Sequence, residues 1–166
     1  MILTRQKIIE SVENGDIYIS NFDKDRVNPN SYNYLLGQQI KIYEGKDKSD
    51  KNSFRTLTLP DEGFILQPGH MYLGVTDEVI GSHKYAMSLI GRSSIGRLGL
   101  FLQTSANLGH VTSSHKWTLE LYACQPIKIY PKMPIGQVSF WCNEGKISCY
   151  GKNHALYNSP QESLTL

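Results

Sequence analysis

Short apolar runs, each broken by turn residues, fill most of the chain after Gly15. These runs are rich in β-branched and aromatic residues, which fit a pleated, half-buried surface. Their close spacing, with Gly, Pro and Asn between them, is typical of sandwiches and barrels rather than of alternating strand–helix units. The pattern predicts a mainly all-β fold, with strands in the segments 17–20, 32–37, 39–43, 54–59, 64–69, 71–76, 85–91, 117–123, 126–131 and 137–141.

One short helix is predicted before this β-rich region. Thr4 can cap it and Gly15 can end it. Ile8, Ile9 and Val12 share one face at helical spacing. We interpret that face as a packing surface rather than a ligand site, because apolar periodicity by itself indicates burial.

Turn-rich stretches complete the expected organisation. The polar run KDKSDKNS at 46–53 predicts a solvated hairpin loop. LQPGHMYLG at 66–74 and YPKMPIGQ at 130–137 each place a Pro turn before a strand, and we interpret them as two similar hairpin corners. A length of 166 residues fits one domain.

Composition excludes several classes of protein. Seventeen Lys and Arg against fifteen Asp and Glu give a net charge of +2, and only 19% of residues are charged. This balance excludes a disordered charged tail and gives no global case for nucleic acid as a partner. The lack of a long apolar run excludes a membrane span. The opening MILTRQKIIE lacks the basic-then-apolar layout of a secretory signal, so we expect a cytoplasmic protein.

The cysteines and histidines predict no metal site. Cys124, Cys142 and Cys149 are odd in number and form no CxxC pair, so neither a disulfide framework nor a structural zinc site is expected. The five histidines form no HExxH or other metal-ligand spacing, and we interpret them as ordinary surface or hydrogen-bonded residues. The signature of the zinc nucleobase deaminases is absent from the sequence as well.

The segment GRSSIGRLGL at 91–100 is the densest in candidate chemistry. Its small residues let backbone N–H groups approach a ligand, and its hydroxyls and arginines suit phosphate oxygens. It is not a Walker A loop, because GxxxxGK[ST] is absent. From residue types alone, a phosphate site and a plain turn with surface arginines are both open.

A second candidate is the strand WTLELY at 117–122. Strand alternation places Thr118, Glu120 and Tyr122 on one face and Trp117, Leu119 and Leu121 on the other. Glu120 is then a lone carboxylate in an aromatic and apolar strand. Such a carboxylate either marks a functional site or lies on the solvated face of an antiparallel strand, and the residues leave both interpretations open.

Five stretches, in order, resemble motifs of the dCTP deaminase family, which is related to the trimeric dUTPases. MILTRQKIIE…GDIYI is similar to the family's opening helix and strand, and VNPNSYNYLLG to its NPSSYDLRLG segment. FILQPGHMYLGVTDEVI is similar to its strand pair, and GRSSIGRLGL is close to identical to its phosphate-binding motif. WTLELYACQPIKIYPKMPIGQVSFW is similar to its catalytic strand and the companion hairpin. Five motifs in the right order make this resemblance specific.

The resemblance implies a dUTPase-like distorted β-barrel with a short N-terminal helix, formed by residues 1–166 as a single domain with 150–166 as a C-terminal lid. It implies a homotrimer with sites between subunits. It implies hydrolytic deamination of dCTP to dUTP and ammonia, which supplies dUTP for dUMP and dTTP synthesis. Magnesium is expected on the substrate triphosphate, and no zinc is expected.

The resemblance also assigns site residues by position. Glu120 matches the catalytic Glu, which would move protons from water to the ring and to the leaving amine. Ala106 matches the residue whose backbone carbonyl, with the Ser93 hydroxyl, aims the reacting water. Arg97 would stabilise charge on the tetrahedral adduct. The implied substrate-binding residues are Arg92, Ser93, Ser94, Ile95, Gly96, Arg97, His110, Thr118, Leu119, Glu120, Tyr150, Tyr157 and Gln161.

Three positions depart from the family pattern. His110 stands where common members carry a sugar-contacting Asp, and bifunctional relatives use that Asp to hydrolyse dUTP. Asn33 stands where an Asp is usual. The tail reads Leu156-Tyr157 in place of a Lys-Tyr pair, for which Lys152 is a candidate substitute. Two alternatives therefore stay open: a dUTP diphosphatase, alone or with deamination, and a non-catalytic nucleotide-binding regulator of the same fold.

Overall fold

The computed structural model describes residues 1–44 and 54–149 of the chain. Two helices, one short 3-10 turn and twelve strands are found in these residues. In chain order they are α1 (Arg5–Glu13), β1 (Ile17–Ile19), η1 (Lys24–Arg26), β2 (Tyr32–Leu35), β3 (Gln39–Tyr43), β4 (Phe54–Thr58), β5 (Phe64–Leu66), β6 (Met71–Ser82), β7 (Tyr85–Gly91), α2 (Ser93–Gly96), β8 (Leu100–Leu102), β9 (Leu108–Gly109), β10 (Ser114–Ala123), β11 (Ile127–Ile129) and β12 (Pro134–Cys142).

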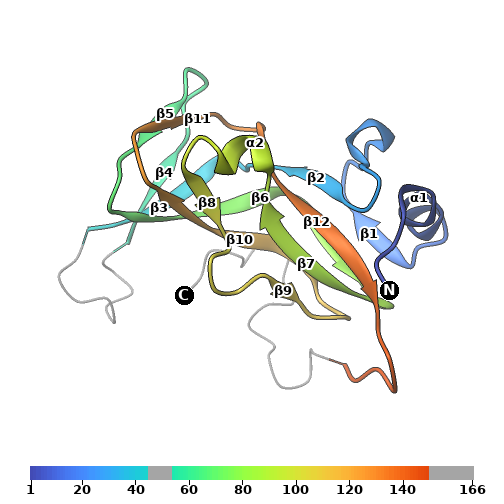
Figure 1. Cartoon of the computed structure of the whole chain (residues 1–166). Coiled ribbons are helices and arrows are strands. Elements are labelled where there is room, and N and C mark those ends of the chain that lie inside the picture. Colours follow the sequence, from blue (N-terminus) through green and yellow to red (C-terminus); the bar gives the residue numbers. More distant parts are fainter. Residues whose placement is uncertain (45–53, 150–166) are drawn as a thin grey trace.

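Two antiparallel sheets enclose the core. One follows the order β4-β3-β6-β10-β8, with β1 also paired to β6, and the other follows β2-β12-β7-β9; β5 and β11 form a small third sheet. Figure 1 shows α1 beside one end of the barrel and the β5–β11 pair at the opposite end. The expected mainly β architecture with a short N-terminal helix is confirmed. The predicted loop at 46–53 and the predicted lid at 150–166 lie outside the described residues.

The long strands extend beyond their predicted segments. β6 continues through Ser82 and β10 begins at Ser114, because polar side chains there are buried with partners instead of ending the strand. Thr76, for example, is fully buried, and its hydroxyl donates to the Glu78 carbonyl at 2.7 Å. The hydropathy pattern alone predicts that β6 ends at Thr76.

The two Pro-containing corners are not hairpins, and that prediction is wrong. β5 pairs with β11 rather than with the next strand along the chain, so both segments turn the chain from this small sheet into a larger one. Positive φ angles make the turns possible, at 80° for Gly69 and 60° for Lys132.

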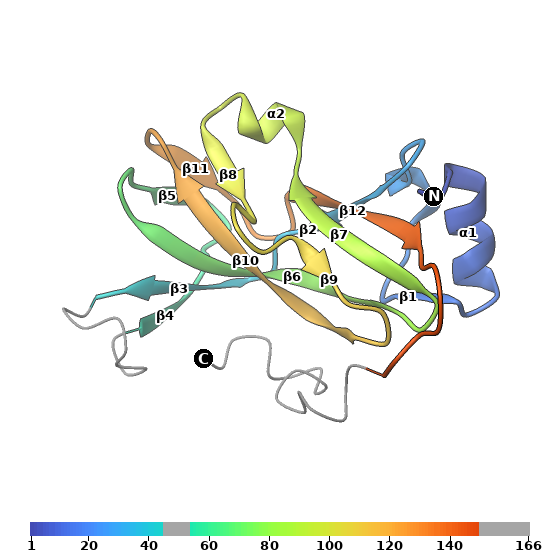
Figure 2. The ribbon, with the colours of Figure 1, turned by 60° about the horizontal axis from the view of Figure 1, so that its bottom comes forward.

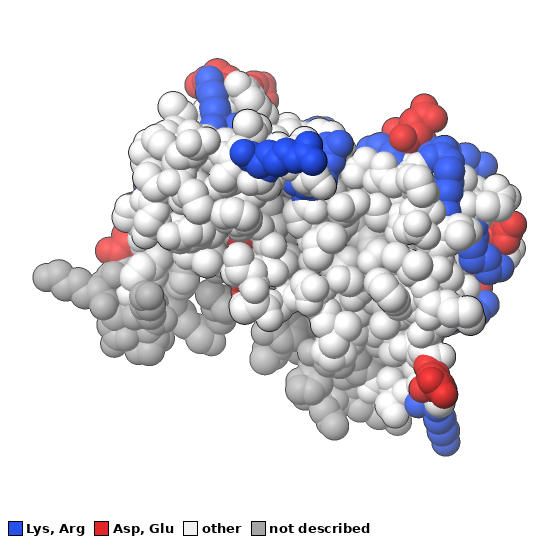
Figure 3. Space-filling model, in the orientation of Figure 1, with Lys and Arg blue, Asp and Glu red and all other residues white. Residues whose placement is uncertain are grey.

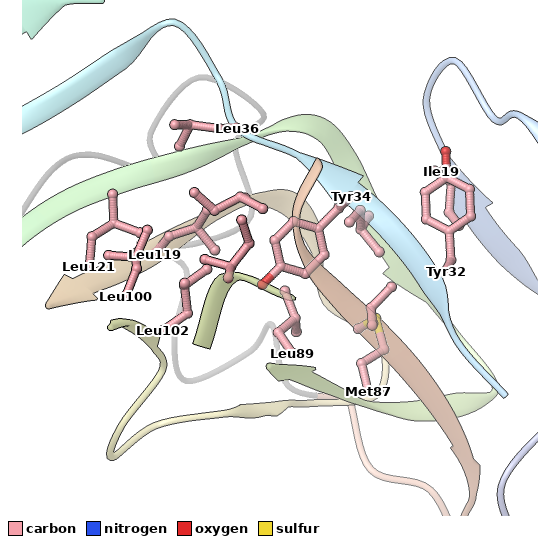
Figure 4. Close-up of a cluster of buried hydrophobic side chains, with 14 of the residues drawn as sticks. Ile19, Tyr32, Tyr34, Leu36, Met87, Leu89, Leu100, Leu102, Leu119 and Leu121 are labelled. Carbon is pink, nitrogen blue, oxygen red and sulfur yellow. The ribbon is translucent and has the colours of Figure 1, made fainter. Parts of the chain in front are cut away.

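Inward-facing side chains of both sheets meet in one continuous core (Figure 4). Ile8 of α1 is completely buried in it, which confirms the helix face as a packing surface. Tyr34 crosses the core, and its hydroxyl donates to the Ile90 carbonyl at 3.1 Å. Burial raises the pKa of Tyr34 above its usual range. A Cβ atom on Gly136 would lie 2.1 Å from the Tyr34 hydroxyl oxygen, so only glycine fits beneath this ring.

A charged pair lies at the edge of this core. The Glu78 carboxylate is 1% exposed and pairs with the guanidinium of Arg26. Its second oxygen accepts a hydrogen bond from the Leu35 amide at 3.0 Å. The Arg26 guanidinium also lies over the Tyr32 ring, 4.9 Å from its centroid. Because a buried charge is tolerated only when it is paired and hydrogen-bonded, this contact ties η1, β2 and β6 together.

None of the helices within 1–44 and 54–149 has the length and apolar character needed to cross a bilayer. The cytoplasmic location stays a prediction.

Replacing Arg26 with Met should leave the buried Glu78 carboxylate without its counter-ion. The free energy of unfolding should fall by about 3–5 kcal/mol, the usual cost of breaking a buried pair from one side, as measured by urea denaturation at pH 7. The double variant Arg26→Met/Glu78→Gln should recover part of this loss, since a neutral Gln oxygen still accepts from Leu35.

Lys24→Met is the matched control, because Lys24 lies in the same turn and makes only an exposed pair with Glu13. Its cost should stay below about 1 kcal/mol. An Arg26→Met variant no less stable than this control would contradict the structural role of the buried pair.

Candidate active site

The segment 91–100 builds one helical turn at the end of β7. Arg92 is extended, with φ of −100° and ψ of 144°, and the N–H groups of Ile95 and Gly96 donate to its carbonyl at 3.0 and 2.8 Å. Ile95 is buried and anchors the turn, whereas Ser93 and Ser94 are exposed. In Figure 2, α2 stands at one edge of the barrel, between β7 and β8.

A polar pocket of about 210 Å³ lies against this turn. Its walls come from α2 and from the neighbouring strands of the four-stranded sheet. The lining residues are Asn28, Asn33, Arg92, Ser93, Ser94 and Gln137. They offer amide, hydroxyl and guanidinium donors and include no carboxylate, which suits an anion rather than a cation. Figure 3 shows blue side chains across the surface where Figure 1 places α2.

Side-chain amides hold this pocket together. Asn28 donates to the Asn33 side-chain oxygen at 3.0 Å, and Ser31 donates to the Gln137 side-chain oxygen at 2.7 Å. The Gln137 amide reaches the Gly91 carbonyl at 3.4 Å. The sequence analysis did not select Asn28 or Gln137. Both residues lie inside stretches that resemble family motifs, VNPNSYNYLLG and PIGQVSF, and this position was the one feature of the sequence that could have indicated them.

Glu120 lies on the outward face of β10. Leu119 and Leu121, on either side of it, are fully buried, while Glu120 is half-buried and Tyr122 is exposed. The predicted alternation along this part of the strand is therefore confirmed. Leu119 points into the core, as Ile95 does on α2.

A β-bulge interrupts the pairing of β10 with β6 beside Trp117. The pairing of β10 with β6 changes register between Lys116 and Thr118. The Trp117 amide is satisfied outside the ladder by the Thr76 hydroxyl at 2.8 Å, and its indole N–H donates to the Ile80 carbonyl at 2.9 Å. Between the pairs Lys116–Val79 and Thr118–Val75, one residue of β10 lies opposite three residues of β6, so the extra residues of this bulge belong to β6. Glu120 faces outward because it alternates along β10 with the buried Leu119 and Leu121.

Two residues after β8, Gln103 and Ser105, contact Glu120. The Ser105 hydroxyl lies 3.5 and 3.4 Å from the two carboxylate oxygens. Gln103 accepts from the Glu120 amide at 2.8 Å and donates to the Ala106 carbonyl at 3.1 Å. Gln103 therefore links the Ala106 carbonyl to the main chain of Glu120. Sequence reasoning missed Gln103 and Ser105, for which the only signal was their closeness to Ala106 in the chain.

Ser93 and Arg97 do not meet Glu120 within one chain. The polar pocket borders β2 and β12 of the four-stranded sheet, whereas Glu120 faces outward from the six-stranded sheet. Across 1–44 and 54–149, neither Ser93 nor Arg97 makes a hydrogen bond or ion pair with that carboxylate. One chain thus carries two separate groups of candidate residues.

The remaining predicted site residues have different placements. His110 is exposed at the end of β9, and Thr118 is half-buried two residues before Glu120 on the same strand face. Tyr150, Tyr157 and Gln161 lie outside the described residues. No cluster of three or more His, Cys, Asp or Glu side chains able to hold a metal ion occurs within the described part of the chain.

Comparison with known proteins places this geometry in a family. A family model described as dCTP deaminase-like matches residues 2–143. A protein of Rhodopirellula baltica called dCTP deaminase is 45% identical over 143 residues, which are 85% of this chain and 72% of that protein. A protein of Clostridium botulinum (strain Eklund 17B / Type B) called dCTP deaminase, dUMP-forming, is 40% identical over 161 residues, which are 96% of this chain and 92% of that protein.

A solved structure has the same fold. The crystal structure of 2'-deoxycytidine 5'-triphosphate deaminase from Agrobacterium tumefaciens aligns with a TM-score of 0.70 at 18% identity, over 89% of this chain and 48% of that one. The chain thus spans about half the length of that solved protein, and the likeness concerns the fold alone. Taken with the family model and the relatives at 40–45% identity, these findings show that the chain belongs to the dCTP deaminase-like family.

Proposed function

We propose that the protein deaminates dCTP hydrolytically, giving dUTP and ammonia. The observation that carries this proposal is the placement of Glu120, which is half-buried on the outer face of β10. Its carboxylate lies beside the Ser105 hydroxyl, and its main chain is linked through Gln103 to the Ala106 carbonyl. A carboxylate beside a carbonyl acceptor can take a proton from a water molecule that the carbonyl holds. The relatives' names and the family motif around 117–120 support the same reaction.

The reaction requires proton transfers that one carboxylate can perform in turn. Glu120 accepts a proton from water as the water oxygen bonds to C4 of cytosine, and it delivers that proton to ring N3. It then transfers a second proton, from the added hydroxyl, to the exocyclic nitrogen. The C4–N bond breaks, ammonia leaves with the bonding electron pair, and the C4 carbonyl forms. Water has then supplied the new C4 oxygen, ammonia has carried away the exocyclic nitrogen, and the Glu120 carboxylate is again ionised and ready for the next turnover.

The polar pocket on α2 supplies binding energy remote from C4. Its hydroxyls, amides and Arg92 suit the triphosphate, and this grip holds the ring against the proton-transfer groups. Magnesium fits here only through the substrate, because the lining offers no carboxylate to hold the ion directly. Bound to the triphosphate, magnesium would neutralise part of its charge.

The proposed assembly is a homotrimer with sites between subunits. It is supported by the separation of the two groups of residues within one chain, since a neighbouring copy could bring Arg97 and Ser93 to Glu120. It is supported also by an apolar row beside Glu120, where Tyr122 pairs with Phe101 on one side and Met71 on the other. All three side chains are exposed in one chain, and apolar surface of this kind marks interfaces.

A second candidate is a deaminase that also hydrolyses dUTP to dUMP and pyrophosphate. The relatives from Clostridium beijerinckii and Clostridium botulinum are both called dUMP-forming. His110 at the position of the family's sugar-contacting Asp argues against this candidate, because bifunctional relatives use that Asp to hydrolyse dUTP. Product analysis decides between them.

Incubation with dCTP and magnesium should release ammonia with dUTP as the accumulating product, measured by ion-exchange chromatography. Accumulation of dUMP and pyrophosphate in step with ammonia would instead establish the second candidate. Binding of dCTP with no ammonia released would favour a non-catalytic regulator and remove deamination altogether.

Glu120→Gln should lower kcat for dCTP about 10²- to 10⁴-fold, because the amide keeps the shape but cannot shuttle protons. Ammonia release under saturating dCTP measures the effect, and dCTP affinity should change little. Glu62→Gln, on the exposed turn before β5, is the control and should match the wild type. Near-normal turnover by Glu120→Gln would remove this residue from the proton-transfer role.

Mixing two inactive variants tests whether the site is shared between subunits. Arg97→Ala and Glu120→Gln should each be nearly inactive alone. Random co-assembly in equal amounts should restore about a quarter of wild-type activity, because one interface in four pairs an intact Arg97 with an intact Glu120 from the neighbour. A mixture no more active than the separate variants would place both residues of each site in a single chain.

A further inference from the structure

Gln103 joins the main chains of two candidate catalytic residues. Its side-chain oxygen accepts from the Glu120 amide at 2.8 Å, and its side-chain nitrogen donates to the Ala106 carbonyl at 3.1 Å. Its own backbone amide donates to the Glu120 carbonyl at 3.3 Å. One side chain therefore spans the gap between the strand that carries the carboxylate and the loop that carries the carbonyl.

The backbone of Gln103 is held in an uncommon conformation to make these contacts. Its φ is 52°, in the left-handed region that non-glycine residues rarely adopt. Such conformations persist where surrounding contacts over-determine them, and they cluster at functional sites. The three hydrogen bonds to Glu120 and Ala106 are the contacts that hold it here.

The loop that follows is fixed at both ends. Ser105 and Ala106 are exposed on it, and Asn107 ties its far end to β7, where its carbonyl accepts from the Leu89 amide at 2.9 Å. Gln103 fixes the near end to β10. Between these two anchors, the direction of the Ala106 carbonyl relative to the Glu120 strand depends on the Gln103 amide.

We propose that Gln103 is a positioning residue for the reaction, which sets the Ala106 carbonyl at a fixed place relative to Glu120 and so aligns the attacking water. This inference rests on the proposed function. Gln103 touches no reacting atom. Its amide group occupies one acceptor site of the Ala106 carbonyl and leaves the second for the water, since a carbonyl oxygen has two lone pairs.

The hydrogen-bond donor of the Gln103 side chain can be removed by substitution with Glu and restored by lowering the pH. In Gln103→Glu, an ionised carboxylate still accepts from the Glu120 amide but cannot donate to Ala106, and it repels the carbonyl oxygen. A protonated carboxyl group donates again. The kcat of each variant is divided by the wild-type kcat at the same pH, so that the effects of other titrating groups cancel in the ratio.

The ratio of Gln103→Glu to wild-type kcat should fall to about one-tenth to one-hundredth at pH 8, a typical cost of misplacing a reacting group. It should rise as the pH falls toward the ordinary pKa of Glu, about 4.3, because protonation restores the donor. KM for dCTP should change little, since the polar pocket lies on the other sheet. Gln103→Met, which lacks both amide atoms, should lose activity at every pH without this recovery.

Asn143→Asp is the matched control. Asn143 makes the same kind of bond, from its amide to the Lys84 carbonyl at 2.8 Å, after β12 and away from Glu120, so its kcat ratio should stay near one at all pH values. Circular dichroism and the thermal midpoint verify that each variant is folded.

The outcomes separate this inference from the proposed function. A wild-type protein that releases no ammonia from dCTP contradicts the function itself. An active wild type with a Gln103→Glu ratio that does not change with pH, or with a change only in KM, overturns the role of Gln103 alone. A pH-independent loss in Gln103→Met with recovery in Gln103→Glu supports it.

Discussion

The antiparallel pairing of β6 with β10 is the contact on which the fold and the candidate site both depend. Its register places Glu120 opposite Leu73 and Leu119 opposite Gly74. Because side chains alternate with a period of two, a slip by one residue would move Glu120 into the core and Leu119 out to solvent. Burial of Leu119 and Leu121 therefore fixes the orientation of the carboxylate.

The sequence predicts much of this architecture because hydropathy alternates wherever one strand face is buried. It fails where buried side chains are polar, as in the second half of β6, where Glu78 and Ser82 look like loop residues but lie in the interior with partners. It also fails for β8 and β9, whose three and two residues are too few for a pattern. The two Pro corners mislead because the sequence gives no indication that β5 pairs with a strand some sixty residues away.

The candidate site shows the same limit. GRSSIGRLGL and Glu120 stand out because their chemistry is local in sequence, and the resemblance to family motifs assigns them roles. Gln103 and Gln137 do not stand out in the sequence, because the role of a glutamine side chain depends on its hydrogen-bond partners in the folded structure. Gln103 reaches Glu120 seventeen residues away, and Gln137 reaches Ser31 across more than a hundred. Contacts of this kind follow from the closed sheets and cannot be read from spacing.

The tight fit between Gly136 and Tyr34 has a consequence for the neighbouring pocket. β12 shifts register against β2 between Pro134 and Gly136, and Gln137 then faces outward toward the amides of the pocket. Any side chain at Gly136 would clash with the buried Tyr34 ring, so the ring or the strand would have to shift. The place of Gln137 beside the pocket therefore depends on the lack of a side chain at the residue before it, on the buried face of the same strand.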